Sequence, residues 1–445
     1  MNIDRLIKNI EESYFIEKPL YDEFNVKRGL RNNDGSGVLV GLTRIGSVRG
    51  YIKDEQEVVP VEGELRYRGI DVVDIVKKLQ EDKRYGFEEV IYLLLFGNLP
   101  TQKELKDFNI ILDSIRDLPD GFTENMILKS PSKDIMNKLA RSILGLYSYD
   151  KNPDDITIKN VLRQCIELIA RFPILIAYGY QAKSHYFENK SLYLHKPYKG
   201  LGTARSFLKM IRPDQKYTEL EAQTLDICLI LHAEHGGGNN SAFTIHVVSS
   251  SDTDTYSAIS AGVGSLKGPK HGGANNKVMN MMDDIKAHVK KWDNEKQVSD
   301  YLVKILKKEA YDRTGLIYGI GHAVYTISDP RTDILKEYAF KLAKEKKRLK
   351  EYHLYTLIET LAPALFQEIK KTDKKICANV DFYSGFVYNM LNLPPELYTP
   401  IFAMSRISGW CAHRIEELIC GGRIIRPAYK SVEPKKDYVS LKDRK

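Results

Sequence analysis

The stretch GPKHGGANNKVMNMMDDI, residues 268–285, joins a glycine-flanked histidine to an amphipathic pattern. Its apolar residues recur at i, i+3, i+4 and i+7, one face of an α-helix, and are Val278, Met281, Met282 and Ile285. His271 precedes them, so we expect it just ahead of a helix N-terminus. A positive helix end favours the neutral imidazole, which can donate a hydrogen bond to a carbonyl oxygen. A tight structural turn is the alternative.

Helical signals continue on the N-terminal side of this stretch. Thr101 followed by Glu104 has the form of a capping box, and Gly97 after the apolar run 90–96 predicts a helix end. The same helical stripe is formed by Val72, Ile75, Val76 and Leu79. These patterns predict a mainly all-α fold.

Two strand-like stretches, residues 38–42 and 58–67, lie among glycine, proline and polar turn residues. They predict a small N-terminal β-hairpin on the helical body.

The chain contains no internal repeat and no long flexible linker, so any second domain shares its core closely with the first. Residues 272–380 are lysine-rich and bounded by glycine-bearing loops, which indicates a small mobile domain. We expect residues 1–271 and 381–445 to form the two parts of a large helical domain.

Composition excludes several classes of protein. With 43% hydrophobic and 28% charged residues among 445, the chain is not disordered throughout. A net charge of +8 is compatible with nucleic acid, a membrane surface, anionic substrates or solubility alone, and its lysine runs favour a solvated face. No stretch approaches the roughly 20 apolar residues of a membrane helix. We expect neither a nucleic-acid nor a membrane partner.

The acidic N-terminal stretch fits neither a secretory signal nor a transit peptide. Five scattered cysteines without a CxxC pair indicate reduced thiols, so we expect a cytoplasmic protein.

Four histidines cluster at His232, His235, His246 and His271. This clustering raises the question of a metal site, but the first two are three residues apart and no cysteine pair completes a ligand set. We therefore predict no metal. For His246 the more frequent alternative is a hydrogen-bonded core histidine.

Further motifs contain polar side chains that could take part in binding or catalysis. His322 in GIGHAVY and Arg331 in SDPR lie close enough to face one anion, and a 2-oxo acid suits the pair. Asp381 in NVDFYSG has apolar and aromatic neighbours, so burial would raise its pKa and strengthen it as a base. Arg406 and Arg426 lie in mostly apolar surroundings, where ligand binding and structural ion pairs are equally good explanations.

Taken in order, the motifs HAEHGGGNNSAF, LKGPKHGGANNKV, GIGHAVYTISDPR, NVDFYSG, MSRISGW and RIIRP resemble the citrate synthase family, and LRYRGID resembles its RG motif. The resemblance covers residues 41–429. It implies an almost entirely helical two-domain fold in which the small domain closes over the substrate.

The resemblance also implies a reaction. His271 would polarise the thioester carbonyl of acetyl-CoA while Asp381 removes a methyl proton, and His322 would polarise the ketone of oxaloacetate. Water would then cleave citryl-CoA to citrate and CoA. No permanently bound cofactor is implied.

Binding residues follow from the same resemblance. The anion cage would consist of His235, Arg331, Arg406 and Arg426, with Arg426 contributed by the partner subunit of a homodimer. CoA adenine would be held by the backbone of a loop containing Leu316, Gly319, Ile320 and Gly321.

Three features depart from the family pattern. Thr326 stands where many members have a basic residue that reaches a CoA phosphate, and Cys377 and Ala378 stand where a proline is common. The N-terminal stretch does not resemble the small domain of the NADH-regulated branch, so we expect no such regulation.

Two alternatives stay open. A 2-methylcitrate synthase would use the same residues on propanoyl-CoA, because one methyl group is worth only about 1–3 kcal/mol in an apolar pocket. A non-catalytic regulator would keep the fold and bind a metabolite or nucleic acid.

Overall fold

The computed structural model describes residue 7 and residues 14–32, 36–54 and 57–444. The chain divides into two compact units, Met1–Arg44 and Ile45–Lys445. The described part of the first unit contains α2 (Lys18–Glu23) and the short 3-10 helix η1 (Arg28–Leu30). The strand expected at residues 38–42 is absent, so that prediction was wrong. Leu39 and Leu42 are 85% and 91% exposed, so the apolar pattern there is not buried as a strand face would be.

The hairpin is formed instead by β1 (Gly46–Asp54) and β2 (Glu57–Tyr67), and β3 (Ile70–Asp71) completes a three-stranded antiparallel sheet. The expected strand at 58–67 is therefore confirmed, with a different partner. Gly46 pairs with Tyr67, and the register shifts between Arg49 and Tyr51.

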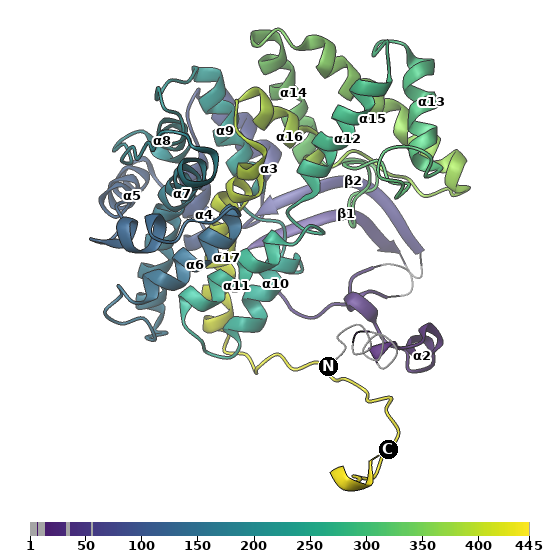
Figure 1. Cartoon of the computed structure of the whole chain (residues 1–445). Coiled ribbons are helices and arrows are strands. Elements are labelled where there is room, and N and C mark those ends of the chain that lie inside the picture. The colour runs from purple at the N-terminus through teal and green to yellow at the C-terminus, as the bar shows by residue number, and fades with distance from the viewer. Residues whose placement is uncertain (1–6, 8–13, 33–35, 55–56, 445) are drawn as a thin grey trace. The chain divides into compact units, whose positions relative to one another are not determined.

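Helices make up most of the second unit, so the predicted mainly all-α fold with a small hairpin is confirmed (Figure 1). Its first group consists of α3 (Val72–Glu81), α4 (Phe87–Phe96), α5 (Gln102–Ser114), the π-helix η2 (Thr123–Leu128), α6 (Ile135–Tyr147), α7 (Ile158–Glu188), α8 (Gly202–Ile211), α9 (Glu219–His232), α10 (Asn240–Ser249) and α11 (Thr255–Lys267). The rest are α12 (Ala274–His288), α13 (Glu295–Leu306), α14 (Pro330–Glu345), α15 (Leu349–Lys370), α16 (Val380–Met390), η3 (Pro395–Leu397), α17 (Tyr398–Cys420) and η4 (Leu441–Asp443).

Local sequence signals account for several of these elements. Both predicted apolar stripes are buried, one in α3 and one in α12. The Thr101 hydroxyl accepts from the Glu104 amide and the Glu104 carboxylate accepts from the Thr101 amide, so the predicted capping box begins α5. Gly97 ends α4 as expected.

Helix α17 is the central element of the large helical group, and Figure 1 shows it among its neighbours. It packs against α4, α6, α7, α9, α10 and α11. All residues from 400 to 414 are buried, including Arg406 and Arg414. A helix that is buried on every side and carries charge must provide those charges with partners.

The helices α12 to α16 form a second packed group. Helix α14 contacts α15 and α16, and it also contacts α3, α9 and β2. The hairpin approaches the segment before α14, where the amide of Gly63 donates to the Ser328 hydroxyl at 3.1 Å. The hairpin therefore supports the segment that carries His322. The small mobile domain expected over residues 272–380 stays a prediction.

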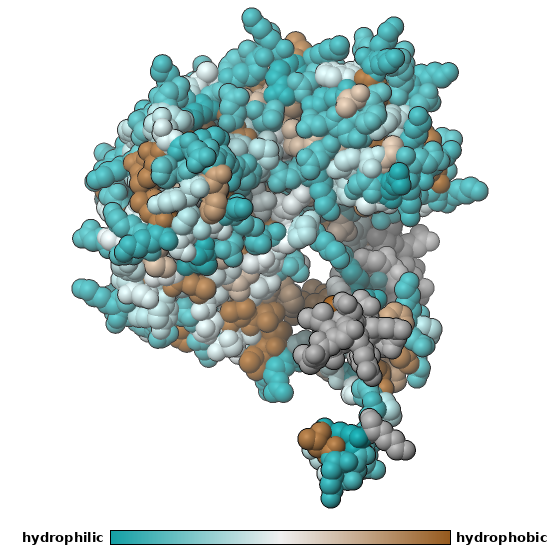
Figure 2. Space-filling model, in the orientation of Figure 1, coloured by the Kyte–Doolittle hydropathy of each residue, from teal (hydrophilic) through white to brown (hydrophobic). Residues whose placement is uncertain are grey.

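The surface in view is mainly hydrophilic, with scattered apolar patches (Figure 2). Within the described part of the chain, no helix combines the length and apolarity needed to cross a bilayer.

Candidate active site

His271 lies in the turn between α11 and α12, three residues before α12 begins, as predicted. Its Nε2 lies 3.1 Å from the Ser241 hydroxyl of α10. The same hydroxyl accepts a hydrogen bond from the Trp410 indole of α17 at 3.0 Å. Two helices of the large group therefore fix the orientation of this imidazole.

The His271 imidazole is neutral at pH 7. Burial, with a further contribution from the positive charge of Arg406, lowers its pKa to about 4. The predicted neutral state is confirmed, but its main cause is desolvation rather than the helix end. A neutral imidazole can hold a proton for a carbonyl oxygen that gains negative charge.

His322 has a defined tautomer. Its Nδ1 accepts hydrogen bonds from the amides of Val324 and Tyr325, both at 3.1 Å. The proton of the neutral ring therefore lies on Nε2. The ring stacks on Tyr325, with centroids 4.7 Å apart, and meets the ring of His235 edge-on at 5.3 Å.

Asp381 is the second residue of α16, and its amide donates to the Asn379 side chain at 3.0 Å. Burial raises the pKa of the carboxyl to about 6, against the opposing influence of Arg331 and Arg406. The predicted upward shift is confirmed. Asp381 is still mostly ionised at pH 7, and it is a stronger base than an ordinary carboxylate.

The loop of residues 316–321 is joined to the segment that precedes Asp381. The Gly321 amide donates to the Cys377 carbonyl at 2.7 Å, and the Asn379 amide donates to the Gly319 carbonyl at 2.8 Å. Gly319 has a φ of 81°, and a Cβ there would lie 2.8 Å from the Phe382 ring. The loop and the Asp381 segment therefore form one hydrogen-bonded unit. Leu316 is half exposed, and Ile320 forms an isolated bridge to Ala378.

Buried charged and polar side chains cluster around His235 and Arg406, and this cluster is called the cationic pocket. Burial and the nearby Arg331 hold the pKa of His235 well below its usual value. Burial lowers the pKa of Arg406 to about 10, where it is still charged at pH 7. Nε2 of His235 and Nη1 of Arg406 are buried and have no hydrogen-bond partner among the described residues. Such groups are suited to an anion with oxygen acceptors.

Arg331 differs in detail from its prediction. Its guanidinium fork binds Asp329, with Nε to Oδ1 at 3.0 Å and Nη2 to Oδ2 at 2.8 Å. The same carboxylate accepts from the amides of Arg331 and Val380, both at 3.1 Å. Nη1 is the guanidinium nitrogen that neither fork contact uses. Arg331 thus supplies charge to the pocket while its fork is held by the protein.

Arg426 is not brought to this pocket within the chain. It is exposed in the segment that follows α17, and that segment is joined to the helical body where the Ile425 amide donates to the Ser250 hydroxyl at 3.0 Å. Thr326 lies beside the hairpin, and its hydroxyl donates to the Gly50 carbonyl at 3.4 Å.

Three residues of the site had no predicted role, although all lie in quoted motifs. They are Ser241, Glu234 and Asp329. Asp329 precedes the proline that begins α14, which is a recognisable N-cap signal. The other two offered no sequence signal, because their partners Trp410 and His413 lie more than 160 residues away.

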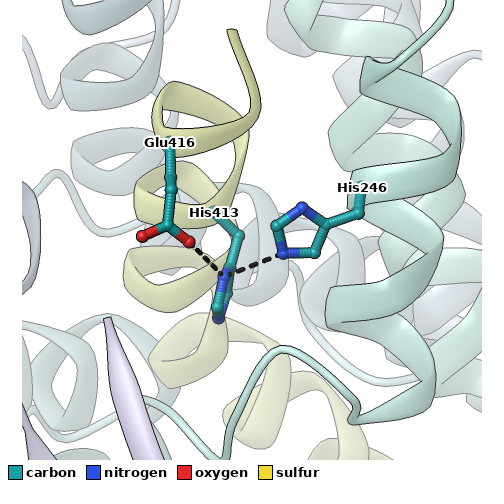
Figure 3. A group of neighbouring side chains, drawn as sticks. All are labelled: His246, His413 and Glu416. Atoms are coloured by element: carbon teal, nitrogen blue, oxygen red, sulfur yellow. Dashed lines mark hydrogen bonds and ion pairs between the residues drawn. The ribbon is translucent and has the colours of Figure 1, made fainter. Parts of the chain in front are cut away.

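One group of three side chains among the described residues has ligand atoms within 4.8 Å of one another, namely His246, His413 and Glu416 (Figure 3). It includes only one of the four clustered histidines. His246 binds the Glu417 carboxylate through Nδ1 at 2.7 Å and lies 3.1 Å from Nδ1 of His413 through Nε2. The hydrogen-bonded alternative for His246 is confirmed.

Together these groups can perform proton abstraction and carbonyl activation. A carboxylate base, two neutral imidazoles and two guanidinium charges influence one another electrostatically across the pocket. Removing a proton from carbon requires such a base together with a donor for the developing oxyanion.

Comparison with known proteins identifies sequence relatives. The sequence model described as citrate synthase, C-terminal domain, matches residues 34–428. The citrate synthase of Haloferax volcanii is 34% identical over 408 residues, covering 90% of this chain and 94% of that protein. The 2-methylcitrate synthase 1 of Corynebacterium glutamicum is 32% identical over 406 residues, covering 89% of this chain and 97% of that protein.

Solved structures give the same result. The citrate synthase of Thermoplasma acidophilum, in a ternary complex with carboxymethyl coenzyme A and oxaloacetate, superimposes with a TM-score of 0.75 at 26% identity. The match covers 94% of this chain and 99% of that one.

Replacing Asp329 tests how far the site depends on the buried ion pair. Asp329→Asn keeps an N-cap side chain but leaves the Arg331 charge without its partner, so we expect the free energy of unfolding to fall by about 3–5 kcal/mol. Glu337→Gln in the same helix removes an exposed pair with Lys341 and should change stability little. Chemical denaturation measures both; equal stability of the two variants would contradict the prediction.

Proposed function

Since the chain belongs to the citrate synthase family, we propose that it condenses acetyl-CoA with oxaloacetate and water to give citrate and CoA. The chain is an acyltransferase of the class that converts the acyl group into an alkyl group on transfer. The observation that best supports a condensation of this type, with either acyl-CoA, is the raised pKa of Asp381 near a cationic pocket that contains neutral histidines.

In the first step, the Asp381 carboxylate takes a proton from the methyl carbon of acetyl-CoA. His271 donates a hydrogen bond to the thioester oxygen, which gains negative charge as the enol forms. This role requires the single Ser241 hydroxyl proton to point to Nε2 of His271 rather than to Oδ1 of Asn239, which lies 2.9 Å from the hydroxyl, so that the other ring nitrogen of His271 carries the proton. Base and donor act together because the base only accepts the proton, while the donor only stabilises the negative charge that develops on the thioester oxygen.

In the second step, the enol carbon attacks the keto carbon of oxaloacetate. The proton on Nε2 of His322 polarises the ketone and passes to the new alkoxide, which gives citryl-CoA. Water then cleaves the thioester to release citrate and CoA. The two amides that bind Nδ1 of His322 support this role because they hold the proton on the opposite nitrogen.

Oxaloacetate is proposed to bind through its carboxylates to Arg406, His235 and Arg331. The unpartnered Nη1 of Arg406 and Nε2 of His235 support this assignment. Fixed donors in a desolvated pocket orient the ketone and cost little reorganisation.

The backbone of residues 316–321 is proposed to hold CoA adenine, with contacts from Leu316, Gly319, Ile320 and Gly321. Its hydrogen bonds to residues 377–379 would join CoA binding to the position of Asp381. We further propose that residues 272–380 close over oxaloacetate before acetyl-CoA binds, so that water is excluded during enol formation.

A homodimer is proposed in which Arg426 completes the partner subunit's oxaloacetate site. Arg426 lies on an exposed C-terminal segment whose apolar side chains include Ile424, Tyr438 and Leu441, with exposed fractions of 54%, 87% and 75%. A segment of this kind would bury those side chains against a second copy.

Proton abstraction and condensation are each assigned to side chains of this protein and the last step to water, so no resident cofactor is proposed. A cytoplasmic location is proposed because all five cysteines are free.

The principal alternative is a 2-methylcitrate synthase, supported by relatives of that name with nearly the same identity as the citrate synthases. A non-catalytic regulator is less well supported, because binding alone does not need His271, His322 and Asp381 in reactive protonation states.

The acyl substrate is tested by comparing kcat/KM for acetyl-CoA and propanoyl-CoA at saturating oxaloacetate. We expect acetyl-CoA to be preferred by roughly tenfold or more, because an extra methyl group must fit the closed pocket. A preference for propanoyl-CoA would assign the chain as a 2-methylcitrate synthase. No thiol release from either thioester by folded protein would support the regulator.

The role of Asp381 is tested by release of CoA thiol with and without oxaloacetate. Asp381→Asn should lower kcat roughly a hundred- to ten-thousandfold, while Asp373→Asn in the preceding exposed segment should retain activity. In the native protein kcat/KM should be fully present above pH 7 and fall as pH drops through about 6, because protonation removes the base. A rate that does not depend on pH between 5 and 8, or an active Asp381→Asn, would exclude this base.

Subunit mixing tests the shared site. Arg426→Gln and Asp381→Asn should each be nearly inactive at low oxaloacetate, but co-refolding equal amounts should restore activity. In a mixed dimer, one site combines an intact Asp381 with an intact Arg426 from the other chain. Random pairing then gives about a quarter of the native sites. Absence of any restoration in confirmed mixed dimers would place Arg426 outside the partner's site.

A further inference from the structure

Glu234 fixes the turn that carries His235. It is fully buried, and it lies immediately before that histidine in the chain. Its Oε1 accepts from the Gly236 amide and from Nε2 of His413, the latter at 3.0 Å. One carboxylate oxygen therefore joins the turn after α9 to helix α17.

Helix α17 leaves room for this side chain. A Cβ on Gly409 would lie 2.3 Å from Oε2 of Glu234 and 2.6 Å from the Ala233 carbonyl oxygen. The glycine allows a charged side chain to approach the helix backbone closely. The buried Glu234 side chain thus packs in space that only a glycine at position 409 leaves free.

The pair of Glu234 and His413 is charged. Burial opposes the ionised form of Glu234, but His413 and Arg406 outweigh it and hold the pKa of the carboxyl below its usual value. Burial likewise opposes protonation of His413, but Glu234 outweighs it and raises the pKa of the imidazole to about 9. Both charges are present at pH 7.

The hydrogen bonds continue from His413 toward α10. Because the imidazolium carries a proton on each nitrogen, Nδ1 donates to Nε2 of His246 across 3.1 Å. His246 is then neutral, and its Nδ1 donates to the Glu417 carboxylate at 2.7 Å. Oε2 of Glu416 lies 3.8 Å from Nδ1 of His413. Figure 3 draws this contact as a dashed line. Each N–H proton of the His413 and His246 rings therefore has an acceptor.

The same atoms are close enough to raise the question of a metal ion. A metal would need the lone pair of Nδ1 on His413 and that of Nε2 on His246. A protonated His413 has no lone pair to offer. The observed hydrogen bonds therefore favour a proton at this position.

Glu234 also lies within electrostatic reach of Arg406. Its Oε2 and Nη1 of Arg406 are both buried and have no hydrogen-bond partner among the described residues. Oε1 is bound by His413 and Gly236, and Oε2 lies beside Gly409 of α17. If the carboxylate turned to Arg406, it would occupy the donor that an incoming anion needs.

We propose that His413 is a positioning residue for oxaloacetate: it holds the Glu234 carboxylate away from Arg406 and thereby keeps that guanidinium open to a substrate carboxylate. The inference rests on the proposed function, because it concerns the same anion. His413 itself does not touch the substrate. It acts through Glu234, on both the His235 turn and the Arg406 charge.

The test is oxaloacetate binding by calorimetry without CoA, together with steady-state kinetics. His413→Gln keeps a neutral donor but loses the charge that holds Glu234, so Kd and KM for oxaloacetate should rise roughly ten- to hundredfold, with little change in kcat or in KM for the thioester. Cys411→Ala is the matched control and should bind oxaloacetate normally, because Cys411 is buried in the same helix with its Sγ 3.9 Å from the Cys165 carbonyl oxygen.

The double variant Glu234→Gln/His413→Gln separates positioning from structural support. A neutral glutamine does not compete for Arg406, so the double variant should regain affinity relative to His413→Gln. If the single variant does not fold, the double variant is compared with the native protein instead, and a Kd for oxaloacetate close to the native value is expected. A folded His413→Gln that binds oxaloacetate as the native protein does, or a double variant weaker than the single one, would overturn it. If the native protein bound no oxaloacetate, the proposed function would fail first.

Discussion

The buried charge of Arg406 is the constraint on which the rest of the site depends. Moving a guanidinium out of water into the middle of α17 costs several kcal/mol unless the surroundings compensate. Hydrogen bonds compensate only part of this cost. Nε of Arg406 donates to the His232 carbonyl at 2.7 Å, but Nη1 has no hydrogen-bond partner among the described residues. Negative charge from Glu234 and Asp381 supplies part of the remainder. An anion that accepted a hydrogen bond from Nη1 would therefore stabilise the buried guanidinium.

The same charge contributes to the protonation states around it. It favours the neutral forms of His235 and His271, and it favours the ionised form of Asp381. Burial acts on all three and is the largest influence on each. The carboxyl of Asp381 becomes a stronger base and the two imidazoles stay neutral, which are the protonation states that the proposed reaction requires.

Sequence reasoning recovered those parts of the site that depend on local signals. Helical spacing placed α3 and α12, and the position of His271 ahead of α12 followed from it. The strand at 38–42 was wrong because an apolar run does not specify which segment will pair with it. Arg331 was expected to face an anion, and the sequence did not show that its fork also binds Asp329, two residues earlier. The N-cap signal for Asp329 was available but does not reveal where the second oxygen of that carboxylate points. The Glu234 to His413 contact had no signal, since it joins residues 179 positions apart.

Asp329 links the region proposed to bind oxaloacetate to the region proposed to bind acetyl-CoA. Its carboxylate caps α14, holds the Arg331 fork and accepts the Val380 amide, so it ties the anion pocket to the first turn of the helix that carries Asp381. The loop at 316–321 is tied to the same turn through residues 377–379. A dianion bound by Arg331 and Arg406 would offset the two charges that lower the pKa of Asp381. Binding of the first substrate would therefore make the base stronger at the position where the second substrate presents its methyl group, which is a physical reason for oxaloacetate to bind first.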